Sequence, residues 1–264
     1  MTAPQQSNPV PRWVYDPPAE GPRVVHESLY DAEVKGKTVP GGFVVVDKPS
    51  GLLAVPGIGP EKTDCTRSRV QSMYPWATGP MTPHRLDLST SGVMILALDR
   101  QTHRNLSIQF EQRKPLKRYV ALVEGHLDRD AGVIDVPMRK DMDRSPTQLV
   151  DWNQGKPSQT EFTVLARETL DLDGRSVPVT RLELRPITGR THQLRVHCSH
   201  PRVVVVGEES DFHLPEQDGL GAPIVGDDMY SGLEAPRLML HACSITFYHP
   251  MTGRRMSVWA VSPF

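Results

Sequence analysis

The 264-residue chain lacks several features that would assign it to a specialised class of protein. Its three cysteines are too few for a paired disulfide framework, which fits a reducing compartment. No apolar run approaches the roughly 18 residues of a membrane span, no internal repeats are visible, and the first residues carry no basic-then-apolar signal. A net charge of −1 gives no global basic field, so a nucleic-acid partner must be held by a local patch. We therefore expect a globular, cytoplasmic protein without membrane association.

Proline is concentrated at the N-terminal end of the chain. Six prolines lie within the first 22 residues, among glutamine, serine and asparagine. Because proline lacks a backbone donor and fixes the backbone, residues 1–38 are predicted to form an extended and partly disordered extension. Trp13, Val14 and Tyr15 leave open a second interpretation, in which part of this extension is a docking strap. Residues 39–264 are then expected to form the folded domain.

Strand signals recur along the rest of the chain. Runs of β-branched and aromatic residues bounded by turn residues predict strands over 43–47, 93–98, 117–125, 133–137, 160–166, 177–185, 238–242, 244–248 and 256–261. Helices are predicted from Thr63 to Met73, from Asp99 to Pro115, and after the turn at 187–190. Consecutive strands at this spacing indicate a largely antiparallel or mixed sheet.

One loop combines several groups that can do chemistry. His84, Arg85 and Asp87 stand in a hydroxyl-rich stretch that leads directly into the apolar strand at 93–98. An aspartate in such a loop either structures the turn through its own backbone or is used chemically, and the pattern alone leaves both interpretations open. Asp99 is better explained as the cap of the following helix.

Two clusters of cations are candidates for phosphate contacts. One precedes Tyr119 and the other lies in a charged loop, and together they contain Arg113, Lys114, Lys117, Arg118, Arg139, Lys140 and Arg144. Either cluster can be a plain solvated surface. A tyrosine beside cations also suits base stacking with phosphate anchoring.

A third stretch places Arg190 at the start of a predicted helix. The positive end of the helix dipole makes this position mildly unfavourable for a cation, which suggests a carboxylate or phosphate partner. Nearby histidines and cysteines invite a zinc interpretation, but their spacing matches no structural zinc pattern, so we expect no metal site. The residues concerned are His197, Cys198, His200, His241 and Cys243.

Taken in order, these stretches resemble the motifs of the RluA family of pseudouridine synthases. The stretch 84–92 is similar to the family motif HRLDxxTSG, in which the aspartate is catalytic. The resemblance extends from Phe43 to Phe264 and includes the stretches 47–53, 117–121, 189–197 and 238–242, with Asp47 where the opening signature has asparagine. No part of the N-terminal segment resembles the small basic RNA-binding module that precedes many members.

The resemblance implies an α+β fold: a mixed, mostly antiparallel sheet in two halves, with flanking helices and a central basic cleft. It implies that Asp87 is the nucleophile, that Tyr119 stacks on the target uracil, and that Arg190 forms an ion pair that fixes Asp87. Arg85 would occupy the space of the flipped base. The other RNA-binding residues implied are His84, Leu86, Arg118, His192, Leu194, Arg195 and Leu240.

The implied reaction moves the uracil from its N1 bond with ribose to a C5 bond, without redox change, so no cofactor is expected. The implied partner is a stem-loop of 23S rRNA and/or tRNA, bound by a monomer. An insertion near 201–225 is longer than usual and either flanks the cleft or forms a remote loop. Two other functions stay open: a non-catalytic RNA-binding or folding factor, and a hydrolase that releases uracil. The matched motifs hold no second acid, which disfavours ordinary glycoside hydrolysis.

Overall fold

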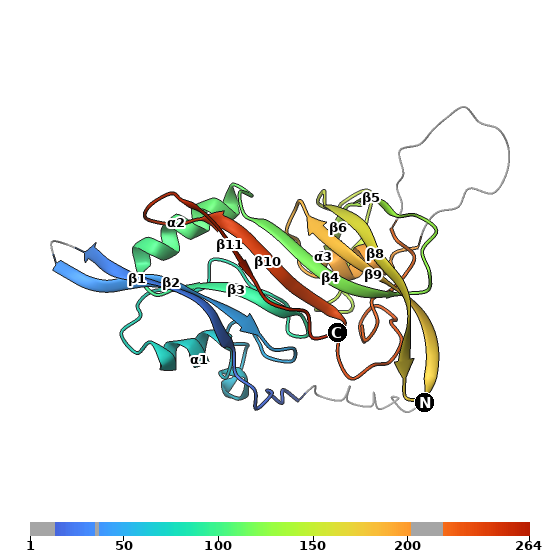
Figure 1. The fold of residues 1–264 in the computed structure, drawn as a ribbon, viewed down its shortest axis with the longest axis horizontal. Helices are drawn as coiled ribbons and strands as arrows, with labels where there is room; N and C mark the ends of the chain where they lie inside the picture. The colour runs from blue at the N-terminus through green and yellow to red at the C-terminus, as the bar shows by residue number, and fades with distance from the viewer. Residues whose placement is uncertain (1–13, 35–36, 202–218) are drawn as a thin grey trace, which may run out of the picture.

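The computed structural model describes residues 14–34, 37–201 and 219–264, most of which build one mixed sheet with helices packed against it (Figure 1). Within these residues the strands are β1 Arg23–Val34, β2 Lys37–Lys48, β3 Ser91–Ala97, β4 Leu116–Glu124, β5 Ala131–Asp135, β6 Met138–Lys140, β7 Gln148–Val150, β8 Gln159–Leu172, β9 Arg175–Pro186, β10 Leu240–Tyr248 and β11 Arg255–Trp259. The α-helices are α1 Thr66–Met73, α2 Arg100–Glu111 and α3 Gln193–Ser199. A single 3-10 turn covers Pro60–Lys62.

The strand order of the main sheet is β1-β2-β3-β10-β4-β9-β8-β5, with β11 paired to β10. Within the described sheet, β3 and β10 form a parallel pair and the other neighbours are antiparallel. Strands β6 and β7 form a separate hairpin. The expected α+β architecture with a mixed, mostly antiparallel sheet is confirmed.

The sheet has two halves, each with its own hydrophobic core. One core gathers apolar side chains of β2, β3 and α2, including Phe43 and Leu106, and the other gathers those of β4, β9 and α3, including Leu182 and Leu194. In Figure 1 the first half lies on the left and the second on the right, with β4 and β10 running between them. Tyr119 packs against both cores, which places it at the junction.

The sheet begins earlier than the expected boundary at residue 39. Strand β1 pairs with β2 from Arg23 to Val34, interrupted by a single register shift after Val24. The prolines of the N-terminal segment end at Pro22, so the residues that follow have the backbone donors a strand needs. The folded domain therefore includes at least part of the proposed extension, while residues 1–13 lie outside the described residues.

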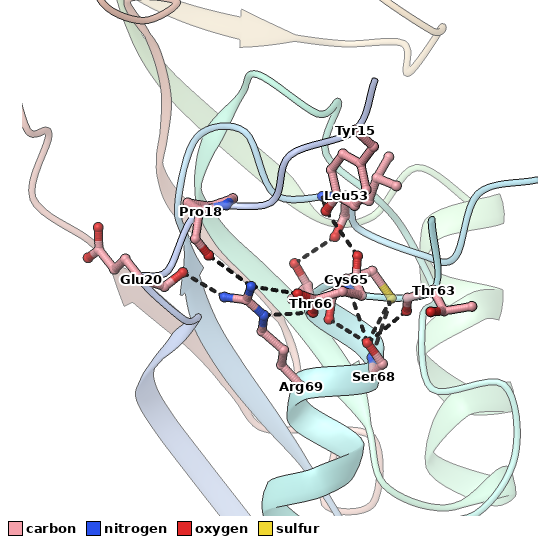
Figure 2. A network of polar contacts seen from close by, with 10 residues as sticks. Tyr15, Pro18, Glu20, Leu53, Thr63, Cys65, Thr66, Ser68 and Arg69 are labelled. Carbon is pink, nitrogen blue, oxygen red and sulfur yellow. Dashed lines mark hydrogen bonds and ion pairs between the residues drawn. The ribbon is translucent and has the colours of Figure 1, made fainter. Parts of the chain in front are cut away.

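Residues 14–22 run along the first half as a strap held by polar contacts (Figure 2). The Tyr15 hydroxyl donates to the Asp64 carbonyl and accepts from the Leu53 amide. The Arg69 guanidinium donates to the carbonyl oxygens of Pro18 and Glu20, both at 2.8 Å. For the described part of this segment, the docking-strap interpretation is the one the contacts support.

The helix starts differ in one respect from expectation. Asp99 caps α2 as predicted, since its carboxylate accepts the Thr102 amide at 2.9 Å. Helix α1, however, is capped by Cys65 and not by Thr63. The Thr63 hydroxyl donates to the Pro60 carbonyl and so belongs to the preceding turn.

The two strands predicted over 238–242 and 244–248 are one strand, β10, with a register shift after Ala242. Most of the predicted insertion, 202–218, lies outside the described residues. Its described end is no surface loop, because Leu220, Ile224 and Val225 are buried in the second core. No helix in the described part of the chain is long and apolar enough to cross a membrane.

Candidate active site

A cleft of about 470 Å³ opens at the junction of the two halves. Its walls come from the 83–90 loop, the end of α2, the start of β4, the segment 186–195 and Leu240 of β10. Cations outnumber carboxylates in this lining, which contains Arg85, Arg113, Lys117, Arg190, Arg195, Asp87 and Glu111. All the site residues expected from the sequence except Arg118 line the cleft.

Asp87 stands on a loop whose backbone is fixed from behind. The Leu88 carbonyl accepts from the Gly51 amide and from the Lys48 ammonium, both at 3.0 Å. The Ser50 hydroxyl donates to the Ser89 carbonyl at 2.7 Å. The stretch after β2 therefore holds the residues that follow Asp87, which orients the carboxylate through the backbone rather than through its own oxygens.

Lys48 is a fully buried cation in the support of that loop. Its ammonium donates to the carbonyls of Pro49, Leu52 and Leu88, so each of its three protons has an acceptor. Burial lowers the pKa of Lys48 to about 7, and the charge of Asp87 opposes this shift. Lys48 thus contributes both backbone anchoring and a nearby positive charge to the Asp87 side of the cleft.

Gly92 allows the loop to enter the sheet beside β10. Its φ is 113°, and a Cβ on this residue would lie 2.3 Å from the Ala242 carbonyl oxygen. No other residue fits this approach, because an L side chain is strained at that φ and would clash with the neighbouring backbone. The close contact sets how far the Asp87 loop lies from the second half.

Tyr119 lies on β4 and faces the cleft from the junction of the two cores. Burial, reinforced by the charge of Asp87, raises the pKa of its hydroxyl, so the ring stays neutral. A neutral aromatic face in a partly apolar cleft suits stacking with a base.

Arg190 lies in the turn that precedes α3, and that turn is ordered by Gln193. The Gln193 side chain accepts from the Arg190 amide and the Thr188 hydroxyl, and it donates to the Gln159 carbonyl. The Arg190 guanidinium donates to the Pro157 carbonyl at 3.2 and 3.3 Å. The expected ion pair with Asp87 is not formed in the described structure, although both residues line the same cleft.

Arg118 is the one expected site residue that does not line the cleft, which corrects the expectation that it lies there with Tyr119. Successive side chains of a strand point to opposite faces, so Arg118 cannot share the face of Tyr119. It forms an ion pair with Glu183 at 3.1 Å, and its neighbour Lys117 lines the cleft instead.

Two further residues have structural contacts that the motif resemblance did not indicate. The His84 ring stacks on Phe110 at 4.4 Å and accepts the Ile95 amide, and burial lowers its pKa to about 3. The Arg195 guanidinium, 2% exposed, binds Asp227 through two hydrogen bonds of 2.6 and 2.8 Å. Burial lowers the pKa of Arg195, but the bonds with Asp227 outweigh it and the net shift is upward. Both residues therefore build the wall of the cleft.

The remaining expected residues form an apolar and polar surface within the same cleft. Leu86, Leu194 and Leu240 are each less than 10% exposed and supply its apolar floor. Arg85 is exposed at the rim. His192 is buried, has a left-handed backbone with φ of 54°, and contacts Tyr230. Tyr230 and Asp227 were not singled out from the sequence, because they lie outside the stretches that resemble the family motifs.

Two observations bear on metal and acid chemistry. In the part of the chain that the structure describes, no group of three histidine, cysteine, aspartate or glutamate side chains is arranged to hold a metal ion. A second carboxylate, Glu111 at the end of α2, does line the cleft, and it is exposed.

Comparisons with known proteins identify a family for this chain. Residues 42–200 match the family model described as RNA pseudouridylate synthase. The chain is 42% identical over 218 residues to the dual-specificity RNA pseudouridine synthase RluA of Yersinia pestis, covering 81% of this chain and 92% of the relative. It is 41% identical over 224 residues to the same-named protein of Haemophilus influenzae, covering 83% and 89%.

A solved structure, human RNA pseudouridylate synthase domain containing 1, is similar with a TM-score of 0.64 and 28% identity, over 93% of this chain and 87% of that chain. The human domain containing 4 protein shares the fold with a TM-score of 0.59. The family model covers more than half of the chain, and the bacterial relatives cover most of it at about 40% identity. The chain therefore belongs to the RNA pseudouridylate synthase family and is an isomerase that converts uridine in RNA to pseudouridine.

Proposed function

We propose that this enzyme modifies uridines in stem-loops of 23S rRNA and/or tRNA, with Asp87 as the nucleophile. The observation that carries this proposal is the placement of Asp87: it lies in a cationic cleft at the junction of the halves, on a loop fixed by hydrogen bonds from Lys48, Ser50 and Gly51. A carboxylate fixed in this way loses little freedom when substrate binds, which favours reaction at one defined atom.

Tyr119 and Arg190 complete the proposed catalytic set. The neutral Tyr119 ring stacks on the target uracil. Arg190 exchanges the Pro157 carbonyl for the Asp87 carboxylate when RNA fills the cleft, because a charge-assisted pair is stronger than a bond to a neutral acceptor. Because the uracil is detached and rejoined without any change of redox state, the proposed reaction requires no cofactor.

The RNA contacts we propose follow the geometry of the lining. Arg85 at the rim occupies the space of the flipped base. Leu86, Leu194 and Leu240 pack near the uracil, and His192 contacts it from the α3 side. Lys117 and Arg113 bind phosphate, a role we assign to Lys117 in place of Arg118. His84 and Arg195 act by shaping the wall.

The substrate range we propose rests on the relatives. The bacterial relatives carry the name dual-specificity, so we propose that this enzyme also acts on more than one RNA. We further propose that it works as a monomer in the cytoplasm, a reducing compartment that suits its three free cysteines.

Pseudouridine mapping tests the proposal directly. Total RNA from cells with and without the gene is treated with a reagent that forms adducts on pseudouridine and is then reverse transcribed. We expect a stop in a tRNA anticodon stem-loop or a ribosomal hairpin to disappear without the gene and to return with wild type but not with Asp87→Asn. Unchanged stops, with purified protein that binds stem-loops but leaves uridine intact, would identify an RNA-binding factor. Abasic product would identify a hydrolase.

A further inference from the structure

Tyr230 joins three parts of the molecule through one hydroxyl group. It lies in the turn after Asp227, whose carboxylate accepts the amides of Met229 and Tyr230, both at 3.1 Å. Asp227 is itself bound to Arg195 of α3, and the Arg195 guanidinium lies over the Tyr230 ring at 5.1 Å from its centroid. The turn and the ring are therefore fixed to α3 by contacts that do not use the hydroxyl.

The hydroxyl of Tyr230 has two partners at 2.8 Å. It accepts the backbone N–H of Gln148, the first residue of β7, and it lies against Nδ1 of His192. Burial raises the pKa of Tyr230 to about 12, so the hydroxyl keeps its proton near neutral pH. Among the described residues, His192 Nδ1 is the acceptor within reach of that proton.

This arrangement determines the tautomer of His192. Burial lowers the pKa of His192, although the charge of Asp87 opposes the shift, so the ring is neutral near pH 7 and carries one proton. Because Nδ1 accepts from Tyr230, that proton is on Nε2. His192 lines the cleft, and among surrounding groups the charge of Asp87 acts on it most strongly. The Nε2–H is therefore a donor of a residue that lines the same cleft as Asp87.

The same hydroxyl also fixes the β6–β7 hairpin, which carries the cations Arg139, Lys140 and Arg144. Gln148 uses its backbone N–H for Tyr230, so removal of the hydroxyl would leave this N–H without its partner. The hairpin and the His192 donor are thus held by one atom.

We propose that Tyr230 is a positioning residue of the enzyme: its hydroxyl holds His192, which lines the cleft, as the Nε2–H tautomer and pins the β6–β7 hairpin next to α3. The kinetic consequences of this proposal depend on the proposed function, whereas the assignment of the His192 tautomer does not. Tyr230 acts through His192 on the reaction step and through the hairpin on RNA binding.

The tautomer is tested first, on the full-length protein without RNA. Nitrogen-15 NMR of the histidine rings, with the His192→Gln spectrum for assignment, is expected to show an unprotonated Nδ1 for His192. In Tyr230→Phe, which keeps the ring and its contact with Arg195, the two ring nitrogens are expected to shift toward each other as the tautomers mix. An unchanged His192 spectrum in Tyr230→Phe would overturn the proposal, whatever the protein does with RNA.

Kinetics on a stem-loop substrate test the consequence. Loss of a buried hydroxyl with two partners is expected to lower kcat/KM about ten- to a hundredfold, through both kcat and KM. Tyr15→Phe is the matched control, because its buried hydroxyl also accepts a backbone amide and donates to a backbone carbonyl, yet it lies outside the cleft. Its kinetics should stay within about twofold of wild type. Equal kinetics in the two variants would contradict the proposal.

Two further variants separate the two actions. Gln148→Pro removes the backbone donor at the first residue of a strand, where proline is tolerated, and should raise KM while leaving the His192 tautomer and kcat unchanged. In the His192→Gln background, Tyr230→Phe should no longer change kcat, because residues that act through one another are not additive. If Tyr230→Phe lowered kcat equally in that background, Tyr230 would not act through His192. A wild-type enzyme inactive on every stem-loop would refute the proposed function and leave the NMR result to decide the tautomer.

Discussion

The Lys48 ammonium lies 3.0 Å from the carbonyl oxygen of Leu88, the residue that follows Asp87. A buried cation thus supports the backbone of the proposed nucleophile from the side away from the cleft. We predict that Lys48→Met, which has similar length, lowers kcat at least about a hundredfold, because the Pro49 and Leu52 carbonyls lose the Lys48 donor at about 1–3 kcal/mol each and the Leu88 carbonyl keeps only the Gly51 amide. Rate measurements with a thermal melt check this, and exposed Lys37→Met is the control. Full activity in Lys48→Met would show that the Asp87 loop keeps its conformation without the hydrogen bonds of Lys48.

The cleft contains two carboxylates, but the proposed reaction uses one. Asp87→Asn should abolish pseudouridine formation, whereas Glu111→Gln should retain at least about a third of the wild-type rate, because Glu111 is exposed at the cleft edge. Both variants are assayed by release of tritium from C5-labelled uridine in RNA. A comparable loss in the two variants would point instead to the acid–base pair of a hydrolase.

Lys117 and Arg118 are adjacent cations on opposite faces of β4. Lys117→Ala should raise KM about three- to tenfold at low salt and reduce the salt dependence of RNA binding by about one phosphate contact. Arg118→Ala should change KM less than about twofold, since an exposed ion pair such as that with Glu183 contributes little. Binding titrations at several salt concentrations compare them, and a larger effect of Arg118 would invert our assignment.

Two buried histidines should make the fold sensitive to acid. The pKa values of His84 and His197 are lowered by burial from 6.5 to about 3, so the unfolded chain takes up protons more readily than the folded one. Their contribution to stability is full above about pH 6.5 and is lost as pH falls toward about 3. Denaturant titrations from pH 7 to pH 4 should show this decline. His197→Gln should flatten it, while exposed His126→Gln should not; equal slopes in both would exclude His197 as a cause.

Most of the site residues predicted from the sequence motifs line the cleft, although Arg118 does not. Asp87, Tyr119 and Arg190 lie more than 30 residues apart from one another, yet all line one cleft as expected. The position of Lys117 could also have been predicted, because alternate residues of a strand share a face and Lys117 therefore lies on the same face as Tyr119. The roles proposed for these residues remain predictions.

Other features depend on contacts that no local pattern records. The ion pair of Arg195 with Asp227 and the bond of His192 to Tyr230 join α3 to residues more than 30 positions later. Lys48 was visible only as part of a turn signal, and its burial follows from the way the Asp87 loop folds over it. Strand β1 was not predicted because the proline-rich extension was expected to reach residue 38, although its last proline is Pro22.

The central place of β10 has a consequence for synthesis of the protein. Among the described strands only β11 follows β10 along the chain, yet β10 lies between β3 and β4 and provides the described contact through which the two halves join in the sheet. A growing chain can form the β1–β3 half and the β8–β9 hairpin early, because their partners are close in sequence. The cleft, in contrast, can close only after residues 240–248 have been added, so RNA binding must wait until β10 has joined β3 to β4.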